Sequence, residues 1–371
     1  MKVRQNSSLL SLKEPRQSIK TSLLSLALLG CMPSSSMADE VLQTEKKLVA
    51  GLESIQSLSI DQALLQFSEL SEQYPNYKLV QLLKADILAI KAGNKSLSDD
   101  IHRRNPRTVG RLKSEALVRW EYSKSIPQHN IEFENHVLKT AQQKHLVFID
   151  LSDNRLYFYE RNSEGVLELK ANYYVSMGRL GSGKQKEGDS KTPVGIYHIV
   201  DLLPDSEVSD LYGIGALPLN YPNKWDLEHG KTGSGIWLHG TPRNTYIRAP
   251  KASRGCIVLN NSAMETLLAE YQLPFSTPVL IVDDVDKISL SVKKNPLVLS
   301  EVKTWLENNH IGVDWGSVSV YRYPNEAGLL YVTFPAELEA ELIHQYWQQG
   351  VDGDWRLVYQ SQEVILVKKP T

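Results

Sequence analysis

The sequence predicts a multidomain protein with a helical N-terminal region, a β-rich middle and a small α+β unit at the end. Apolar residues recur at helical spacing before residue 125, and the period changes to that of strands near residue 145. Mixed helix and strand patterns return after residue 290. A chain of 371 residues is long enough for two or three domains. We place the three regions at 39–125, 140–287 and 290–371.

The composition is that of an ordinary globular protein, with 42% hydrophobic and 23% charged residues. A net charge of −2 argues against a nucleic-acid partner, because phosphate affinity comes mainly from clustered Lys and Arg. The two cysteines, Cys31 and Cys256, are too few for a disulfide framework. A zinc site needs three or four ligands, and one Cys with scattered His does not provide them. We therefore expect neither a metal nor another cofactor.

Residues 1–38 are typical of a signal peptide for export. A basic segment precedes an apolar core at 21–30, which is far shorter than the ~20 residues needed to span a bilayer. The small-x-small pattern Ser36-Met37-Ala38 predicts cleavage before Asp39. A second interpretation stays open, because Leu28-Leu-Gly-Cys31 resembles a lipobox in which Cys31 carries a lipid anchor. Both interpretations place the mature protein in the periplasm or cell envelope.

The region 39–125 is predicted to contain a helical hairpin and a connector. Helical spacing from Ile60 to Leu70 is interrupted at 74–77, resumes from Leu79 to Ile90 and ends at 93–94. Two amphipathic helices across a short Pro-containing turn resemble one tetratricopeptide unit. Because one such pair buries little core, we expect it to pack against another part of the chain. The polar stretch 94–130 is predicted to be an irregular connector around one weakly amphipathic segment.

The region 140–287 is predicted to be mostly β. Apolar runs at 145–151 and 154–160 flank Ser152-Asp153, which predicts a hairpin. Ser262 and Glu265 match a capping box and predict a helix at 262–271. Long loops cover 178–194 and 202–234. The other predicted strands lie at 166–177, 195–201, 235–239, 256–259 and 278–283.

The region 290–371 is predicted to alternate helices and strands. The helices are expected around 298–308 and at 336–349. The strands are expected at 317–323, 328–334, 355–360 and 363–368.

Two residues with catalytic chemistry stand at the edges of predicted strands. His239 ends one apolar run, and Cys256 begins another. Each residue alone is more often structural, but neighbouring strands would bring this pair together. A nearby His can hold a Cys thiolate as an ion pair and later protonate a leaving amine. No Asp or Glu lies close to His239 in sequence, so the carbonyl of Gly240 is the expected group that orients its ring.

His239-Gly240 followed by Ser253-Arg254-Gly255-Cys256 resembles the catalytic signature of the L,D-transpeptidases, the YkuD-type domain. The upstream run Lys191-Thr192-Pro193-Val-Gly195 is similar to a strand-loop-strand element of that family. The matching motifs all lie within about 145–285. The resemblance implies a β-rich domain whose Cys attacks the carbonyl between an L-centred diamino acid and a terminal D-alanine. The resulting thioester passes its acyl group to an amine or to water.

The resemblance implies that Cys256 is the nucleophile, that His239 is the acid/base and that Gly240 offers its carbonyl. Ser253 and Gly255 then shape the nucleophile loop, whose amides would form an oxyanion hole. Many family members carry Arg two residues after the Cys, but Val258 stands there in this chain. Substrate carboxylates would instead meet Arg254 or Arg243, although such an arginine is more often just a solvated charge. The loop 202–234 is long enough for a lid in which aromatics such as Tyr221 pack on a peptide.

The sequence therefore predicts a peptidoglycan L,D-transpeptidase that acts on stem peptides, forming cross-links or attaching a wall-linked acceptor protein. Two alternatives stay open. Water would make the enzyme an L,D-amidase or carboxypeptidase, and an unreactive thiol would leave a non-catalytic wall-binding module. The C-terminal region faintly resembles the nuclear-transport-factor-like domains appended to some L,D-transpeptidases. Because no motif lies outside 145–285, the outer regions are expected to be dispensable for bond cleavage.

Overall fold

The computed structural model describes residues 36–94, 96–125, 133, 135–273, 275–283, 296–309, 312–336 and 341–364. Most of the predicted signal peptide, including Cys31, lies outside these described residues. Within them, no helix combines the length and apolar character needed to cross a bilayer.

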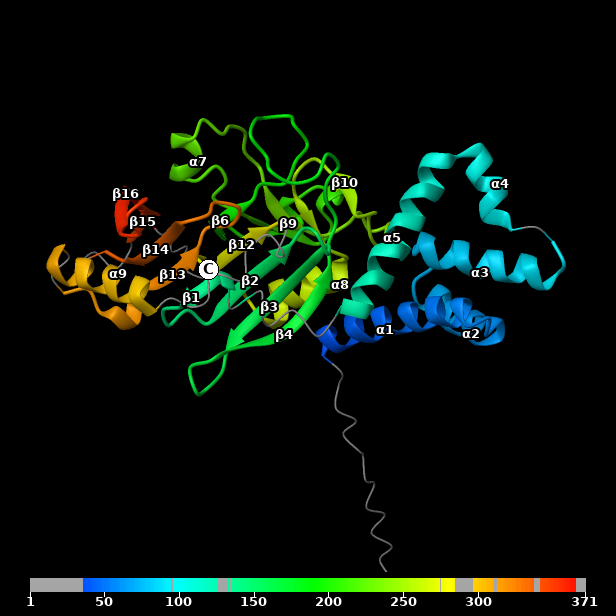
Figure 1. Cartoon of the computed structure of the whole chain (residues 1–371). Helices are drawn as coiled ribbons and strands as arrows, with labels where there is room; N and C mark the ends of the chain where they lie inside the picture. Colours follow the sequence, from blue (N-terminus) through cyan, green and yellow to red (C-terminus); the bar gives the residue numbers. More distant parts are fainter. Residues whose placement is uncertain are drawn as a thin grey trace, which may run out of the picture. The chain divides into compact units, whose positions relative to one another are not determined.

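The N-terminal region consists of helices α1 to α5, drawn in blue to cyan in Figure 1. The hairpin predicted around residues 74–77 is confirmed as α2 followed by α3. The predicted irregular connector is wrong, because α4 and α5 occupy most of it. Pro106 opens α5 at a position where a missing N–H costs nothing. The bounds are Met37–Gln56, Ile60–Gln73, Lys78–Lys91, Leu97–Arg104 and Pro106–Ser125.

These helices pack against the β-rich middle of the chain, as expected from the small core of a single hairpin. Val41 of α1 belongs to the same buried cluster as residues of the central sheet. Glu45 of α1 pairs with Arg119 of α5 and with Arg155 of the middle region, and Arg155 is only 1% exposed. A buried guanidinium must be paired, so these contacts fix the helices to the sheet.

The middle region contains a five-stranded sheet in the order β4-β3-β2-β12-β6. The predicted hairpin is confirmed as β2 paired antiparallel with β3. All six residues of β2 are buried, which explains its nearly continuous apolar run. The bounds are His145–Asp150 for β2, Arg155–Arg161 for β3, Leu167–Tyr174 for β4, Gly195–His198 for β6 and Pro278–Val282 for β12.

A second sheet in the order β11-β9-β8-β7 carries the two candidate catalytic strands, and β10 pairs with β5 beside it. The predicted helix near residue 262 is present as α8, continued by a π-helical turn at Thr266–Glu270. Its N-cap is Asn260 and not the predicted Ser262, because the Asn260 side chain accepts from the Ala263 N–H. The bounds are Met177–Gly178 (β5), Leu203–Pro204 (β7), Gly215–Pro218 (β8), Trp237–His239 (β9), Lys251–Ser253 (β10), Ile257–Val258 (β11) and Asn261–Glu265 (α8).

The C-terminal region is a five-stranded antiparallel sheet, β1-β13-β14-β15-β16, with helix α9. The predicted helix at 336–349 is wrong, because Glu341–Gln349 forms strand β15 between two antiparallel partners. The two strands predicted at 355–360 and 363–368 are one strand, β16, as far as the described residues extend. The bounds are Val137–Lys139 (β1), Pro296–Asn309 (α9), Ser319–Arg322 (β13), Leu329–Pro335 (β14) and Trp355–Val364 (β16).

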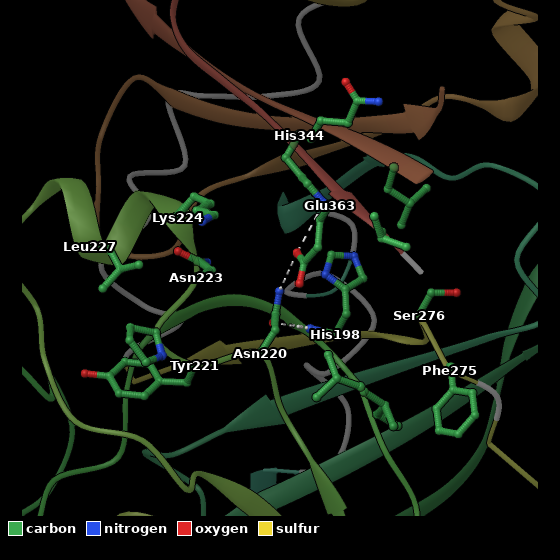
Figure 2. A pocket seen from close by; sticks show the side chains of 16 residues that line it. His198, Asn220, Tyr221, Asn223, Lys224, Leu227, Phe275, Ser276, His344 and Glu363 are labelled. Carbon is green, nitrogen blue, oxygen red and sulfur yellow. Dashed lines mark hydrogen bonds and ion pairs between the residues drawn. The ribbon is translucent and has the colours of Figure 1, made fainter. Parts of the chain in front are cut away.

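One face of this C-terminal sheet packs against the middle region through aromatic side chains. Trp225 of α7 (Lys224–Glu228) stacks on Tyr346 with ring centroids 4.4 Å apart. A cavity of about 580 Å³ lies at the same junction. Figure 2 shows His198 and Asn220 on one side of it and His344 and Glu363 on the other.

Candidate active site

The two strands that carry His239 and Cys256 lie side by side in the second sheet. Strand β11 pairs parallel with β9, and Val258 is the register partner of His239. The Leu259 N–H donates to the His239 carbonyl at 2.9 Å, which continues the pairing past β11. His239 is the last residue of β9, and Cys256 directly precedes the neighbouring strand β11. The predicted adjacency of the two strands is confirmed.

The imidazole of His239 is buried and held by the following residue. Its Nδ1 lies 2.7 Å from the Gly240 carbonyl oxygen, which can only accept, so Nδ1 bears the hydrogen. Nε2 is then the basic nitrogen. The Tyr212 ring meets the imidazole edge to face, with centroids 5.0 Å apart. Burial lowers the pKa of His239 to about 4, partly countered by the hydrogen bond to Gly240. The imidazole is therefore neutral at pH 7.

Cys256 is half-buried, and its thiol donates to the Gly235 carbonyl at 3.3 Å. Burial raises the pKa of this thiol, while the backbone N–H of Trp237 and the charge of Arg248 act in the opposite direction. A raised thiol pKa and a lowered imidazole pKa both favour the uncharged pair. This resting state differs from the thiolate–imidazolium ion pair expected from the sequence.

The loop before Cys256 is closed by its own side chains. Ser253 Oγ donates to the Cys256 carbonyl at 2.7 Å and accepts from the Gly255 N–H at 3.0 Å. Gly255 has a φ of +134°, and a Cβ there would lie 2.8 Å from the Lys191 carbonyl oxygen. Thr192 Oγ1 donates to the Gly255 carbonyl at 2.9 Å. The Lys191-Thr192 segment therefore supports the nucleophile loop.

The turn after His239 has a second support that the sequence did not reveal. Asn261 Oδ1 accepts from the Thr241 N–H at 3.0 Å. A Cβ on Gly240 would lie 2.2 Å from that same oxygen, so only glycine fits beside it. Asn261 thus holds the carbonyl of Gly240 in the position where it accepts from His239.

Arg248 is the other residue that sequence reasoning missed. It is half-buried, and its Nη2 donates to the Leu211 carbonyl at 3.1 Å. Its charge lowers the pKa values of both His239 and Cys256, which places it near both groups. It stands eight residues before Cys256 in no recognisable motif, so only the folded chain brings it to the site.

The predicted substrate-binding residues lie in three different environments. Arg254 is exposed beside Cys256. Arg243 forms ion pairs with Asp205 and Asp210, and the carboxylate of Asp205 is the main cause of its raised pKa. Tyr221 is buried, and its hydroxyl donates to the Thr232 carbonyl at 3.2 Å. Figure 2 shows its ring among the residues that line the junction cavity.

The junction cavity does not contain the candidate catalytic pair. Neither Cys256 nor His239 lines it. Two other aromatic residues of the predicted lid, 202–234, make contacts outside the candidate site. Trp225 packs on Tyr346, and His229 Nδ1 lies 2.8 Å from the Trp225 carbonyl oxygen. The chemistry of the 239–256 region, and not cavity size, therefore defines the candidate site.

A half-buried thiol, a neutral imidazole on the next strand and a glycine-containing loop form a site suited to acyl transfer through cysteine. Residues 144–281 match the model of YkuD, the L,D-transpeptidase catalytic domain. The middle region of the chain therefore matches the L,D-transpeptidase catalytic domain, and this match supports a cell-wall enzyme.

Several solved structures resemble the chain. Bd1075 from Bdellovibrio bacteriovorus is 23% identical and covers 62% of this chain and 98% of its own, with a TM-score of 0.46. The helical cell shape determining protein Pgp2 from Campylobacter jejuni is 20% identical over 62% and 92%, with a TM-score of 0.42. An L,D-transpeptidase from Xylanimonas cellulosilytica is 21% identical over 38% and 61%, with a TM-score of 0.27. The search of curated proteins returned no match.

Proposed function

We propose that this chain is a peptidoglycan L,D-transpeptidase that works through a thioester on Cys256. The observation that carries the proposal is the pairing of β9, which ends at His239, with β11, which Cys256 directly precedes; His239 is neutral, and its Nδ1 is bound to the Gly240 carbonyl. That bond leaves Nε2 as the acceptor for a proton. The family match of residues 144–281 supports a stem peptide as the substrate.

In the acylation step, Cys256 Sγ attacks the carbonyl carbon between the diamino acid and the terminal D-alanine. The thiol proton passes to His239 Nε2 as the C–S bond forms. The oxyanion needs backbone N–H donors, and the Gly255 N–H is already bound to Ser253 Oγ. The N–H groups of Arg254 and Cys256 are the remaining donors of the loop. His239 then protonates the amine of D-alanine as the C–N bond breaks.

In the second step, an acceptor amine attacks the thioester while His239 takes its proton. The tetrahedral intermediate expels the sulfur of Cys256, which regains a proton from His239. An amine on another stem peptide gives a cross-link, and an amine on a wall-linked protein gives an attachment. Water as the acceptor gives an L,D-carboxypeptidase or amidase by the same route. No contact in the described residues favours a non-catalytic wall-binding role.

We also propose that the chain is exported and acts in the periplasm or cell envelope. The signal pattern at residues 1–38 supports this, with cleavage before Asp39 or lipidation of Cys31. The mass of the intact mature protein separates the two routes. A mature chain that begins at Asp39 supports soluble export, whereas a diacylglyceryl mass on Cys31 supports a lipid anchor.

The function is tested by incubating the full chain with a purified stem tetrapeptide, with and without an added acceptor amine. Mass spectrometry of the products should show release of D-alanine and, with the amine, an amide adduct of the tripeptide. Tripeptide acid alone in the presence of amine favours the hydrolase. If the peptide stays intact while a carbapenem still acylates Cys256, the chain is not an enzyme for this substrate.

A further inference from the structure

A cleft of about 620 Å³, the α5 cleft, lies between helix α5 and the middle region. Arg107 and Arg111 on α5 form one wall. Pro250 and Lys251, where β10 begins, lie on the opposite wall. Figure 1 labels both elements. Its volume is in the usual range for ligand sites, roughly 300–1,000 Å³.

The charge of the α5 cleft favours an anionic ligand. Arg107, Arg111 and Lys251 are exposed, and none of the ion pairs among the described residues involves them. Asp283 is the acidic residue that lines the cleft, and its carboxylate accepts hydrogen bonds from Ser182 and Asn325. The N-terminal turn of α5, which begins at the cleft, adds a partial positive charge.

The cleft is preformed because α5 is fixed to the middle region by buried charges. Arg119 of α5 is 4% exposed and pairs with Glu45 and Glu115. Its guanidinium also lies 3.9 Å from the ring centroid of Tyr174 on β4. Glu45 in turn pairs with Arg155 of β3 at 2.6 Å. A ligand would therefore meet the two walls already in place.

The cleft lies within reach of the nucleophile. Lys251 is paired with Met177, and the same strand continues through Ser253 into the loop of Cys256. The Cα atoms of Lys251 and Cys256, five residues apart, lie at most roughly 18 Å from each other, and a tetrapeptide spans about 14 Å when extended. A peptide whose reacting carbonyl is at Cys256 can therefore place other groups in the cleft. Arg248, which directly precedes the lining residue Ala249, extends the positive charge toward Cys256.

We propose that the α5 cleft binds free carboxylates of the stem peptide whose acyl group Cys256 takes, which makes the helical region part of substrate recognition. This inference rests on the proposed function for the identity of the peptide. Arg107, Arg111 and Lys251 supply the charge, and the exposed Ser114 of α5 supplies a neutral donor. The ligand class is a short peptide with free carboxylates, and amidation of those groups removes the attraction.

The test measures binding of a stem tetrapeptide to the full chain by calorimetry at low salt. Cys256→Ser is the background, so that no turnover occurs. Arg111→Glu should weaken binding about three- to tenfold, because a screened surface attraction becomes a repulsion. Lys113→Glu is the matched control, since Lys113 is exposed on the same helix and does not line the cleft. It should change the affinity by less than about twofold.

Two further measurements complete the test. A tetrapeptide with amidated carboxylates should bind weakly and equally to both variants. Carbapenem acylation of Arg111→Glu with Cys256 intact should match the wild type, which shows an undisturbed site. Equal affinities of Arg111→Glu and Lys113→Glu, or no measurable binding to their common background, would overturn the cleft proposal. Tight binding of the tetrapeptide without acylation of the wild-type enzyme would support the cleft proposal and contradict the proposed transpeptidase function.

Discussion

At the scale of single residues, the neutral state of the catalytic pair is the main feature of this site. Burial lowers the pKa of His239 to about 4 and raises that of the Cys256 thiol. A neutral imidazole is ready to accept a proton at pH 7, whereas an imidazolium is not. In the proposed mechanism the proton moves during attack, and the charge of Arg248, which lowers the pKa of Cys256, would support the developing thiolate.

The role of Arg248 is tested by Arg248→Gln. Removing its charge should raise the pKa of Cys256 and slow alkylation by iodoacetamide at pH 7, because less thiolate is present. The pH profile of alkylation should move to higher pH. Arg254→Gln is the control, since Arg254 is exposed in the nucleophile loop. Superimposable pH profiles for the wild type and Arg248→Gln would show that Arg248 does not affect the Cys256 thiol.

Gly255→Ala tests the support of the nucleophile loop. The new Cβ would meet the Lys191 carbonyl at 2.8 Å at a backbone φ of +134°. We expect a loss of about 1–3 kcal/mol in the free energy of unfolding and slower acylation. Gly188→Ala is the matched control, because Gly188 has a φ of +75° with nothing within 4 Å of a Cβ. Denaturant unfolding of both variants measures the difference, and equal losses would mean that the contact with Lys191 does not matter.

At the scale of elements, the sequence reveals strands that follow each other along the chain and misses those paired over long distances. The hairpin around Ser152 and the strands of His239 and Cys256 were predictable, because local apolar runs mark them. Strand β1 pairs with β13, about 180 residues away, and no local pattern signals that. The acidic, alanine-containing sequence at 336–341 favours a helix locally, but residues 341–349 pair with β14 and β16 instead.

In the candidate site, too, the residues in local motifs could be predicted from the sequence, and those brought in by the fold could not. The His-Gly and Ser-x-Gly-Cys motifs identified Cys256 and His239, whose chemical roles stay predictions. Arg248 and Asn261 reach the site only through the fold, so sequence proximity pointed instead to Arg254 and Arg243. The likenesses of the outer regions to a tetratricopeptide unit and to a nuclear-transport-factor-like domain also stay predictions.

The helical region is tested through Glu45. Burial alone would raise the pKa of Glu45, but Arg119 and Arg155 hold it below its ordinary value. Glu45→Gln leaves the buried Arg155 without its counter-charge and Arg119 with Glu115 alone, so we expect a loss of about 3–5 kcal/mol in the free energy of unfolding. Glu53→Gln, at an exposed position of the same helix, should cost less than about 0.5 kcal/mol. Similar unfolding curves for the two variants would show that the buried ion pairs do not secure α1.

The ion pairs of Glu45 also predict how truncation of the chain affects its stability. The motifs alone predict that the outer regions are dispensable for bond cleavage. A protein limited to residues 140–287 would lack Glu45 and leave Arg155 exposed to solvent or unpaired. We therefore expect such a truncated protein to be less stable than one that begins at Asp39, even where Cys256 still reacts.

At the scale of the whole molecule, acid should destabilise the fold. Burial lowers the pKa of His136, His239 and His344 to about 4 and that of His198 to about 3. Below the ordinary value of 6.5, the unfolded chain binds protons that the folded chain does not. Stability therefore rises with pH between about 4 and 6.5, by roughly 1.4 kcal/mol per pH unit for each histidine.

Two carboxyls oppose this trend. Burial raises the pKa of Asp150 from 3.8 to about 7 and also raises the pKa of Glu115, so the folded chain binds extra protons there and gains stability as the pH falls. Four histidines outweigh two carboxyls, and the Tm should fall from pH 6.5 to 4.5. His198→Gln should flatten this slope, whereas a substitution of the exposed His102 should not. A Tm that is constant or rises on acidification would show that the buried histidines are not neutral.

The central claim is that Cys256 forms the acyl-enzyme with help from His239. It is tested most directly by the intact mass of the full chain after brief mixing with a stem tetrapeptide. The wild type should gain the mass of the peptide without its terminal D-alanine, and peptide mapping should place it on Cys256. His239→Ala should form this adduct about 10²–10⁴-fold more slowly. An adduct of the same mass on Cys256→Ser at the wild-type rate would contradict the account.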